Sequence, residues 1–240
     1  MYLLRLKKIF AILKSWTYLK TFLRLRVAPA IEHDHLWGLG FETVVDVGAN
    51  KGQFSLAASK HLGRSLKIFA FEPQATESKV FQSLFRTCPN VVLYEVAIGP
   101  RTREVSMNIS KSKDSSSLLE ITGLQNDLYP NTEKVSTEII KERPLVSFLG
   151  AEQISGLSLL KIDVQGYEKS VLEGSAGLLK EFDYLYCECS YVELYEGQTL
   201  AHDIIRELYE ASFKVIGVYN TSYASDGASI QSDLLFQRFS

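Results

Sequence analysis

The sequence predicts an α/β protein with a Rossmann-like, mostly parallel sheet that is covered by helices on both faces. From Phe41 onward, short apolar stretches that suit buried strands alternate with stretches that suit helices. Two of the apolar stretches carry an acid near their end, Asp46 and Glu72, and a glycine-rich turn follows the first. The 240 residues suffice for one such domain and a short extension.

Charge divides the chain into a basic extension, residues 1–31, and an acidic domain, residues 32–240. Seven of the 26 basic residues lie within 1–31, which holds no acid, so 19 basic and 28 acidic residues remain, a net charge of −9. A domain of that sign is a poor nucleic-acid binder, so we expect no nucleic-acid partner. Three cysteines form no disulfide pattern and favour a reducing cytoplasm. We expect Cys187 and Cys189 to be buried free thiols.

The residue pattern of the extension predicts one helix from Met1 to Val27. Apolar residues fall on one arc of its first half and basic residues on the other: Leu3, Leu6, Ile9, Phe10, Leu13 and Trp16, against Arg5, Lys7, Lys8 and Lys14. No run is apolar enough to span a bilayer or to serve as a signal peptide. Two interpretations stay open: the helix packs on the domain or a second subunit, which we favour, or residues 1–27 lie on the inner membrane surface. The segment His33–His35 is expected to be a loop.

The first strand and its turn organise the domain. Val44, Val45 and Val47 suit a buried parallel strand. Gly48 and Gly52 permit a tight turn and close backbone approach, and Asn50 tolerates a positive φ. The helix that follows, Gln53 to Leu62, points its N-terminal amides at whatever lies above the strand.

The spacing around this turn favours S-adenosylmethionine as the ligand. It is not the G-x-G-x-x-G pattern of dinucleotide sites, which makes an NAD-linked dehydrogenase unlikely. It is not a Walker A phosphate-binding motif either, because Lys51 is followed by Gly52 rather than by Ser or Thr. An acid such as Asp46 suits a cation better than a phosphate, and S-adenosylmethionine carries a sulfonium and an ammonium. Glu72 ends the second strand, 68–72, where such folds offer an acid to ribose hydroxyls.

The elements between the second strand and residue 150 include an insertion. We expect a helix at 76–86, a third strand at 91–97, and an insertion at about 103–148. Within the insertion, 104–109 alternates like a half-exposed strand, and 135–148 suits a hairpin or edge strands broken by Pro144. A segment this long could form a substrate lid.

The α/β pattern then resumes to the C-terminus. We expect strands at 157–163, 184–190, 214–219 and 233–238, and helices at 167–182 and 200–211. The last two strands would form an antiparallel hairpin that closes a seven-stranded sheet.

Three motifs resemble the FkbM-type S-adenosylmethionine-dependent methyltransferases. They are Asp46–Phe54, Phe71–Pro73 and Lys161–Glu168, the last with Val171–Gly174 behind it. The resemblance runs from about Phe41 to the C-terminus and implies a class I methyltransferase fold and O-methylation, often of a sugar or polyketide-derived hydroxyl. Gln165 departs from the pattern, because many relatives carry a glutamate there, so a catalytic acid at this position is in doubt.

Position in this fold assigns the cofactor site. The strand ends meet around one crevice, where Asp46 and the turn should hold the methionine part, Glu72 the ribose, and the Ala97 region the adenine. The predicted cofactor-binding residues are Asp46, Gly48, Ala49, Asn50, Gly52, Gln53, Phe54, Glu72, Pro73 and Ala97.

A hydroxyl acceptor must also lose its proton, which requires a base or a metal ion. Asp163, at the end of the fourth strand, is the first candidate and Glu188, at the end of the fifth, is the second. A divalent metal ion is left undecided. Glu168 is interpreted as structural, paired with Lys161, and aromatic residues in 191–198 could stack on a sugar ring.

Two function classes follow. The first is an O-methyltransferase that acts on a sugar, a glycan or another small natural product. The second is a non-catalytic module that keeps the cofactor fold and serves as a partner- or membrane-recruited scaffold. Intact Asp46, Glu72 and Asp163 favour the enzyme. A homo-oligomer remains an open expectation.

Overall fold

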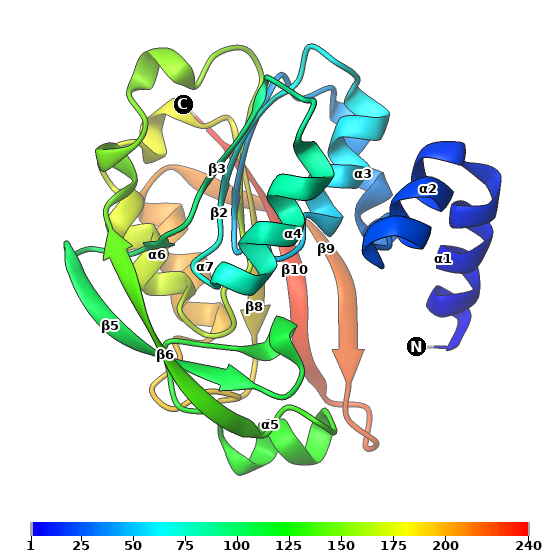
Figure 1. Cartoon of the computed structure of the whole chain (residues 1–240). Coiled ribbons are helices and arrows are strands. Elements are labelled where there is room, and N and C mark those ends of the chain that lie inside the picture. Colours follow the sequence, from blue (N-terminus) through cyan, green and yellow to red (C-terminus); the bar gives the residue numbers. More distant parts are fainter. Residues whose placement is uncertain (1, 240) are drawn as a thin grey trace.

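A seven-stranded sheet forms the centre of the molecule, as predicted (Figure 1). The computed structural model describes residues 2–239, with side chains from Leu4 onward, so Met1 and the Leu3 side chain lie outside the described part. The sheet has the order β3-β2-β1-β7-β8-β10-β9. Its strands are β1 (Thr43–Val47), β2 (Lys67–Phe71), β3 (Val91–Tyr94), β7 (Ser158–Ile162), β8 (Tyr184–Ser190), β9 (Phe213–Tyr223) and β10 (Ser229–Arg238).

The sheet is parallel except at one edge. β1 pairs in parallel with β2 and with β7, so Val47 lies between Phe71 and Ile162 and the carboxyl ends of all three strands meet. β10 runs antiparallel to both β8 and β9, which confirms the predicted hairpin. Both hairpin strands are longer than predicted, because the mostly polar segments 220–223 and 229–232 continue the pairing.

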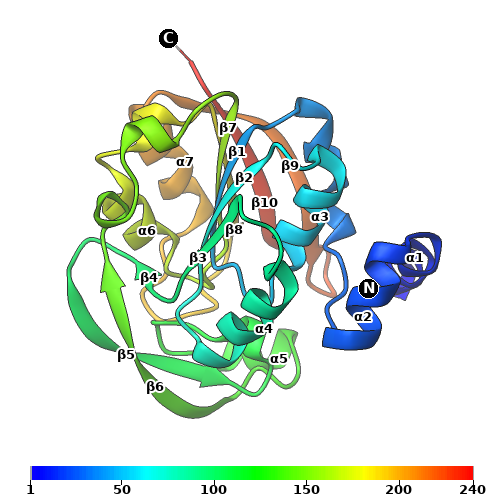
Figure 2. The same ribbon diagram turned by 45° about the horizontal axis from the view of Figure 1, so that its top comes forward.

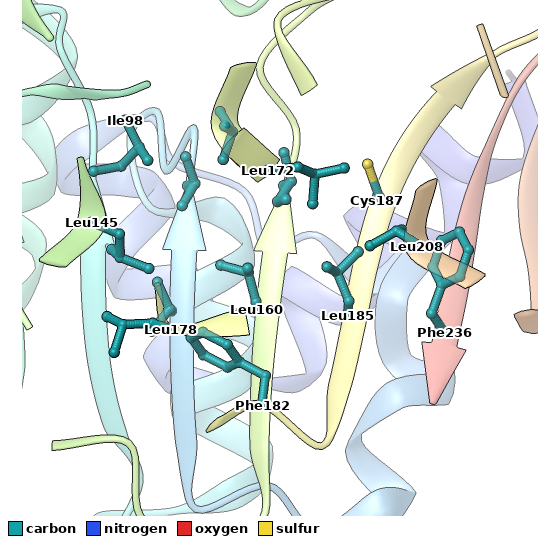
Figure 3. Packing of buried hydrophobic residues seen from close by; sticks show 14 of the residues in the cluster. Ile98, Leu145, Leu160, Leu172, Leu178, Phe182, Leu185, Cys187, Leu208 and Phe236 are labelled. Carbon is teal, nitrogen blue, oxygen red and sulfur yellow. The ribbon is translucent and has the colours of Figure 1, made fainter. Parts of the chain in front are cut away.

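Helices cover one face of the sheet through an apolar core (Figure 3). Here α6 (Glu168–Ser175) and α7 (Ala201–Glu210) pack with the short 3₁₀ helices η3 (Leu145–Ser147) and η5 (Leu179–Glu181). Leu160, Leu185 and Phe236 project from the strands toward Leu172 and Leu208 of the helices. Cys187 and Cys189 are buried and carry free thiols, as predicted. The predicted helix at 167–182 ends early, at Ser175, since two glycines, Gly174 and Gly177, weaken its continuation.

The opposite face carries α3 (Gln53–Leu62) and α4 (Ala75–Phe85), close to the predicted bounds. A second apolar core joins them to the sheet and to the 3₁₀ helix η1 (Ile31–Leu39). The prediction of a loop at His33–His35 was wrong, because buried Leu36 and Trp37 anchor this segment against the core as a helix.

The extension forms two helices rather than one (Figure 2). α1 (Tyr2–Lys14) and α2 (Trp16–Leu25) are separated by Ser15, which has an extended backbone and whose hydroxyl accepts the Tyr18 N–H of α2. A residue that caps the N-terminus of one helix interrupts any helix that precedes it, so the single helix predicted from Met1 to Val27 was wrong. No helix within residues 2–239 is long and apolar enough to cross a bilayer.

The insertion builds a second, three-stranded sheet of order β4-β6-β5. Its strands are β4 (Ala97–Ile98), β5 (Arg103–Ser110) and β6 (Lys134–Arg143), with η2 (Lys113–Ser115) and α5 (Gly123–Leu128) between β5 and β6, and η4 (Ala151–Gln153) after η3. The predicted strand 91–97 is therefore two strands in different sheets, with Glu95 and Val96 between them. β6 is one continuous strand that stops before Pro144, because proline cannot donate to the ladder.

Candidate active site

A cavity of about 270 Å³ lies at the carboxyl ends of β1, β2 and β7. The turn after β1 and the residues after β2 and β7 form its wall on the sheet side, while η1 and the insertion supply the rest. Most of the predicted cofactor-binding residues line it: Gly48, Ala49, Asn50, Gln53, Phe54, Glu72, Pro73 and Ala97. Asp163 lines it too, whereas Asp46, Gly52 and Glu188 do not.

The turn from Gly48 to Gly52 takes the shape its residues predict. Gly48, Asn50 and Gly52 all have positive φ, at 78°, 47° and 90°. A Cβ at Gly48 would collide with the backbone carbonyl oxygen of Asp163, so β1 and β7 approach too closely for any side chain there. A Cβ at Gly52 would lie 2.9 Å from the Phe81 ring, so Gly52 serves the packing of α4 rather than the cavity.

Glu72 is held rigidly in the cavity wall. Its two carboxylate oxygens accept the backbone N–H groups of Asn50 and Gln74, each at 2.8 Å. Burial raises the pKa of Glu72 to about 7, although these two N–H donors act in the opposite direction. The side chain is thus pre-oriented, and its ionised form, which prevails above about pH 7, can accept hydroxyl groups.

Asp46 lies behind the cavity and pairs with Lys161. The carboxylate is fully buried, accepts the Ser55 hydroxyl at 2.7 Å, and lies 3.1 Å from the Lys161 ammonium. The ammonium also donates to the Gly48 carbonyl at 3.0 Å, which ties β7 to the turn. Burial lowers the pKa of Lys161, but the charges of Asp46 and Asp163 outweigh it and the net pKa is raised. Lys161 is therefore a fixed positive charge under the turn, a role that the spacing did not reveal.

Gln165 joins the two predicted catalytic carboxylates. Its side-chain amide donates to Asp163 at 2.9 Å and to Glu188 at 2.8 Å, and its amide oxygen accepts the Tyr195 hydroxyl at 2.7 Å. Its backbone has a φ of 57°, which is unusual for a residue other than glycine, and its carbonyl accepts the Ser117 hydroxyl. Asp163, with a side chain 40% exposed, faces the cavity, and Glu188 lies behind Gln165.

The structure contradicts two interpretations of the sequence around Gln165, those of Glu168 and Tyr195. Glu168 does not pair with Lys161; it accepts the N–H of Gly166 at 2.9 Å, and burial raises its pKa to about 7. Tyr195 is 1% exposed and packs against Gly166, so it has no face to offer a sugar ring. Tyr191 is 37% exposed but does not line the cavity. Burial, with the nearby charge of Asp163, raises the pKa of Glu188 well above its usual range.

Gln165→Glu is expected to destabilise the protein by about 1–3 kcal/mol. The variant puts a third carboxyl group between Asp163 and Glu188, where a protonated acid can donate only one of the two hydrogen bonds. The new carboxyl group has a raised pKa in the folded state. The loss of folding stability is therefore smallest below the pKa of about 4.3 that a glutamate has in the unfolded chain, and it grows as the pH rises. Urea unfolding at acidic and neutral pH measures it, with exposed Gln82→Glu as the control. An unchanged midpoint at both pH values would contradict the bridging role.

Residues outside the three motifs complete the cavity, and no spacing rule could have found them. Lys8 reaches it from α1 of the extension, and His33 reaches it from η1. Burial and the Lys161 charge lower the pKa of His33 to about 3, so this imidazole is neutral at physiological pH. Asp114 and Ser116 reach the cavity from the insertion, where the Lys113 carbonyl accepts the Gln74 side chain at 3.2 Å. The insertion thus forms part of the cavity wall.

Metal ligands were left undecided by the sequence. Among residues 2–239, no group of three or more His, Cys, Asp or Glu side chains is placed to hold a metal ion.

Comparisons with known proteins agree with the motifs. A family model for the methyltransferase FkbM domain matches residues 46–215. The 2-O-methyltransferase NoeI of Sinorhizobium fredii (strain NBRC 101917 / NGR234) is 24% identical over 189 residues, 76% of each chain. The crystal structure of methyltransferase FkbM from Methylobacillus flagellatus KT superposes with a TM-score of 0.52 and 16% identity, over 81% of this chain and 43% of that one. This chain thus spans less than half of that solved protein, and the likeness concerns the fold.

Proposed function

Because the chain belongs to the FkbM methyltransferase family, we propose that it transfers a methyl group from S-adenosylmethionine to a hydroxyl of a sugar, a glycan or another small natural product. The observation that carries the proposal is the placement of two carboxylates, Glu72 and Asp163, in one cavity beside the turn after β1. NoeI, a relative over 76% of its length, is named as a 2-O-methyltransferase, which supports oxygen as the accepting atom.

The cavity residues fit the cofactor at both ends. Glu72 offers a buried acceptor for the ribose hydroxyls, and the apolar side chains of Val96, Ala97 and Ile98 offer a surface for the adenine ring. The backbone of the turn after β1 lies open to the cavity between Glu72 and Asp163, where the methionine part would lie. Bound there, S-adenosylmethionine supplies an electrophilic methyl group on a positively charged sulfur.

Asp163 is the residue we assign as the base. Its carboxylate is partly exposed to the cavity and is oriented by the Gln165 amide at 2.9 Å and the Lys161 ammonium at 3.7 Å. An acceptor hydroxyl would donate to this carboxylate, and Asp163 would take its proton as the oxygen gains the methyl group, the methyl–sulfur bond breaks and S-adenosylhomocysteine leaves. Glu188 acts through Gln165, because it does not reach the cavity, and is a positioning residue.

Labelled methyl transfer tests the proposal. Incubating glycan and lipid extracts with the enzyme and methyl-labelled S-adenosylmethionine, followed by mass spectrometry, should show products that gain one labelled methyl group on oxygen. Asp163→Asn serves as the control. If no product gains label while the cofactor product S-adenosylhomocysteine still binds, the protein is the alternative, a non-catalytic module recruited by a partner or a membrane.

Binding of S-adenosylhomocysteine is expected to weaken as the pH falls below about 7. The ionised form of Glu72 accepts the ribose hydroxyls, and protonation below its pKa of about 7 removes acceptor capacity. The affinity should fall by up to about tenfold per pH unit.

Calorimetry across this range measures the effect. Glu72→Gln should bind weakly and without this pH dependence, whereas Glu168→Gln should keep it, because Glu168 has a similar pKa of about 7 but does not line the cavity. The same pH profile in Glu72→Gln as in the wild type would contradict the assignment.

A further inference from the structure

One face of α1 is an exposed apolar arc, defined here as Leu6, Ile9, Phe10, Leu13 and Trp16. Their side chains are between 49% and 76% exposed. The four that lie within α1 follow the i, i+3, i+4, i+7 spacing of a single helix face, and Trp16 is the first residue of α2. Single exposed apolar residues are common on proteins, but a contiguous set of this size marks a contact surface.

The opposite face of α1 is fixed to the domain. Ile12 is buried, and the Lys8 ammonium pairs with Glu32 of η1 at 2.7 Å. α2 is anchored by buried Tyr18 and by its contacts with α4. The predicted packing on the domain thus holds for this face, and the apolar arc is left exposed. α1 itself lies at the edge of the molecule in both views (Figures 1 and 2).

Basic side chains border the apolar arc. At 100° per residue, Lys7 and Lys14 lie along one edge and Arg5 along the other. All three are exposed, and none pairs with an acid within the described part of the chain. The Lys14 ammonium lies 4.7 Å from the Phe10 ring centre, so the charge and the apolar surface are adjacent. Lys20 and Arg24 of α2 and Arg26, which follows α2, are exposed basic residues of the same extension.

We propose that the apolar arc and its basic border dock the protein on an anionic lipid bilayer, with α1 lying in the plane of the headgroups. Apolar side chains would enter the boundary of the acyl chains while the basic border meets lipid phosphates. The charge distribution selects this occupant. A second copy packed on the same surface would bring two positive borders together, whereas anionic headgroups neutralise them. The net charge of −9 on residues 32–240 turns the remainder of the molecule away from the bilayer.

Docking would also fix part of the cavity wall. Lys8, one residue from Lys7 but on the domain-facing side of α1, lines the cavity. The helix that binds lipid is therefore the helix that closes one side of the site.

Vesicle sedimentation tests the proposal on the full chain. The wild-type protein should sediment with phosphatidylcholine vesicles that contain phosphatidylglycerol and much less with phosphatidylcholine alone. Binding should weaken when salt rises from about 0.1 M to about 1 M, because the Debye length falls from roughly 10 Å to roughly 3 Å. Lys7→Glu/Lys14→Glu should weaken binding by roughly tenfold or more. Phe10→Glu/Leu13→Glu should abolish it.

Matched controls separate docking from general effects. Ile139→Glu changes an apolar residue of β6 that is 65% exposed, and Lys180→Glu changes a lysine of η5 whose side chain is 80% exposed; both should bind vesicles as the wild type does. Unchanged S-adenosylhomocysteine binding and melting temperature in the α1 variants would show an intact domain. If the wild type fails to bind anionic vesicles, or forms a dimer in sedimentation velocity that Phe10→Glu/Leu13→Glu separates, the proposal is overturned.

Discussion

Asp163→Asn is expected to lower turnover by roughly 10²- to 10⁴-fold, the usual contribution of a general base. The substitution keeps the shape of the side chain, and an Asn oxygen can still accept the Gln165 amide, but the negative charge that takes the proton is gone. The affinity for S-adenosylhomocysteine should change much less, because Glu72 and the turn after β1 remain intact.

Single-turnover rates and calorimetry on the same preparation check both parts of this prediction. Adding a chelator to the wild type distinguishes two roles of the carboxylate: no effect assigns a base, and a loss that Mg²⁺ restores assigns a metal ligand. Near-normal turnover of Asp163→Asn would move the role to another residue of the cavity.

Asp46→Ala is expected to destabilise the fold by about 3 kcal/mol or more, because it leaves the Lys161 ammonium buried without its closest anion. The Gly48 carbonyl at 3.0 Å and Asp163 at 3.7 Å are the remaining partners of that charge. Ser55 loses its acceptor as well. Urea unfolding measures the loss.

A double variant distinguishes a structural role from a direct contact with the cofactor. Asp46→Ala/Lys161→Met removes both charges and should be more stable than Asp46→Ala alone. If Asp46→Ala instead unfolds at the wild-type midpoint but binds no S-adenosylhomocysteine, Asp46 contacts the cofactor directly, as its place in the sequence predicts.

The sequence predicts the main sheet well because local signals and long-range packing agree there. Buried strands such as β1 and β8 are rich in apolar and β-branched or aromatic residues, and the positive φ at Gly48, Asn50 and Gly52 follows from residue type. It predicts the extension and insertion less well. A single capping residue, Ser15, divides the predicted helix, and Ala97 joins a sheet whose partner strand, β6, lies about 40 residues further along the chain.

The candidate site could also be predicted only in part from the sequence. Glu72 and Asp163 directly follow β2 and β7, and the end of a strand is visible in a sequence. The sequence does not show whether a carboxylate faces the cavity or lies behind it, because that depends on the residues that pack beside it. Lys161 holds Asp46 behind the cavity, and Gln165 lies between Glu188 and the cavity. Lys8 and His33 come from a segment outside the family motifs, and only the fold brings them to the site.

The central claim is that this cavity binds the methyl-donating cofactor, and calorimetric titration with S-adenosylhomocysteine tests it most directly. The wild-type protein should bind one equivalent with a micromolar Kd. Glu72→Ala should weaken the binding by about 1–3 kcal/mol, since hydrogen bonds to a charged acceptor are lost. No binding to the folded wild-type protein, or equal binding by Glu72→Ala, would contradict the account.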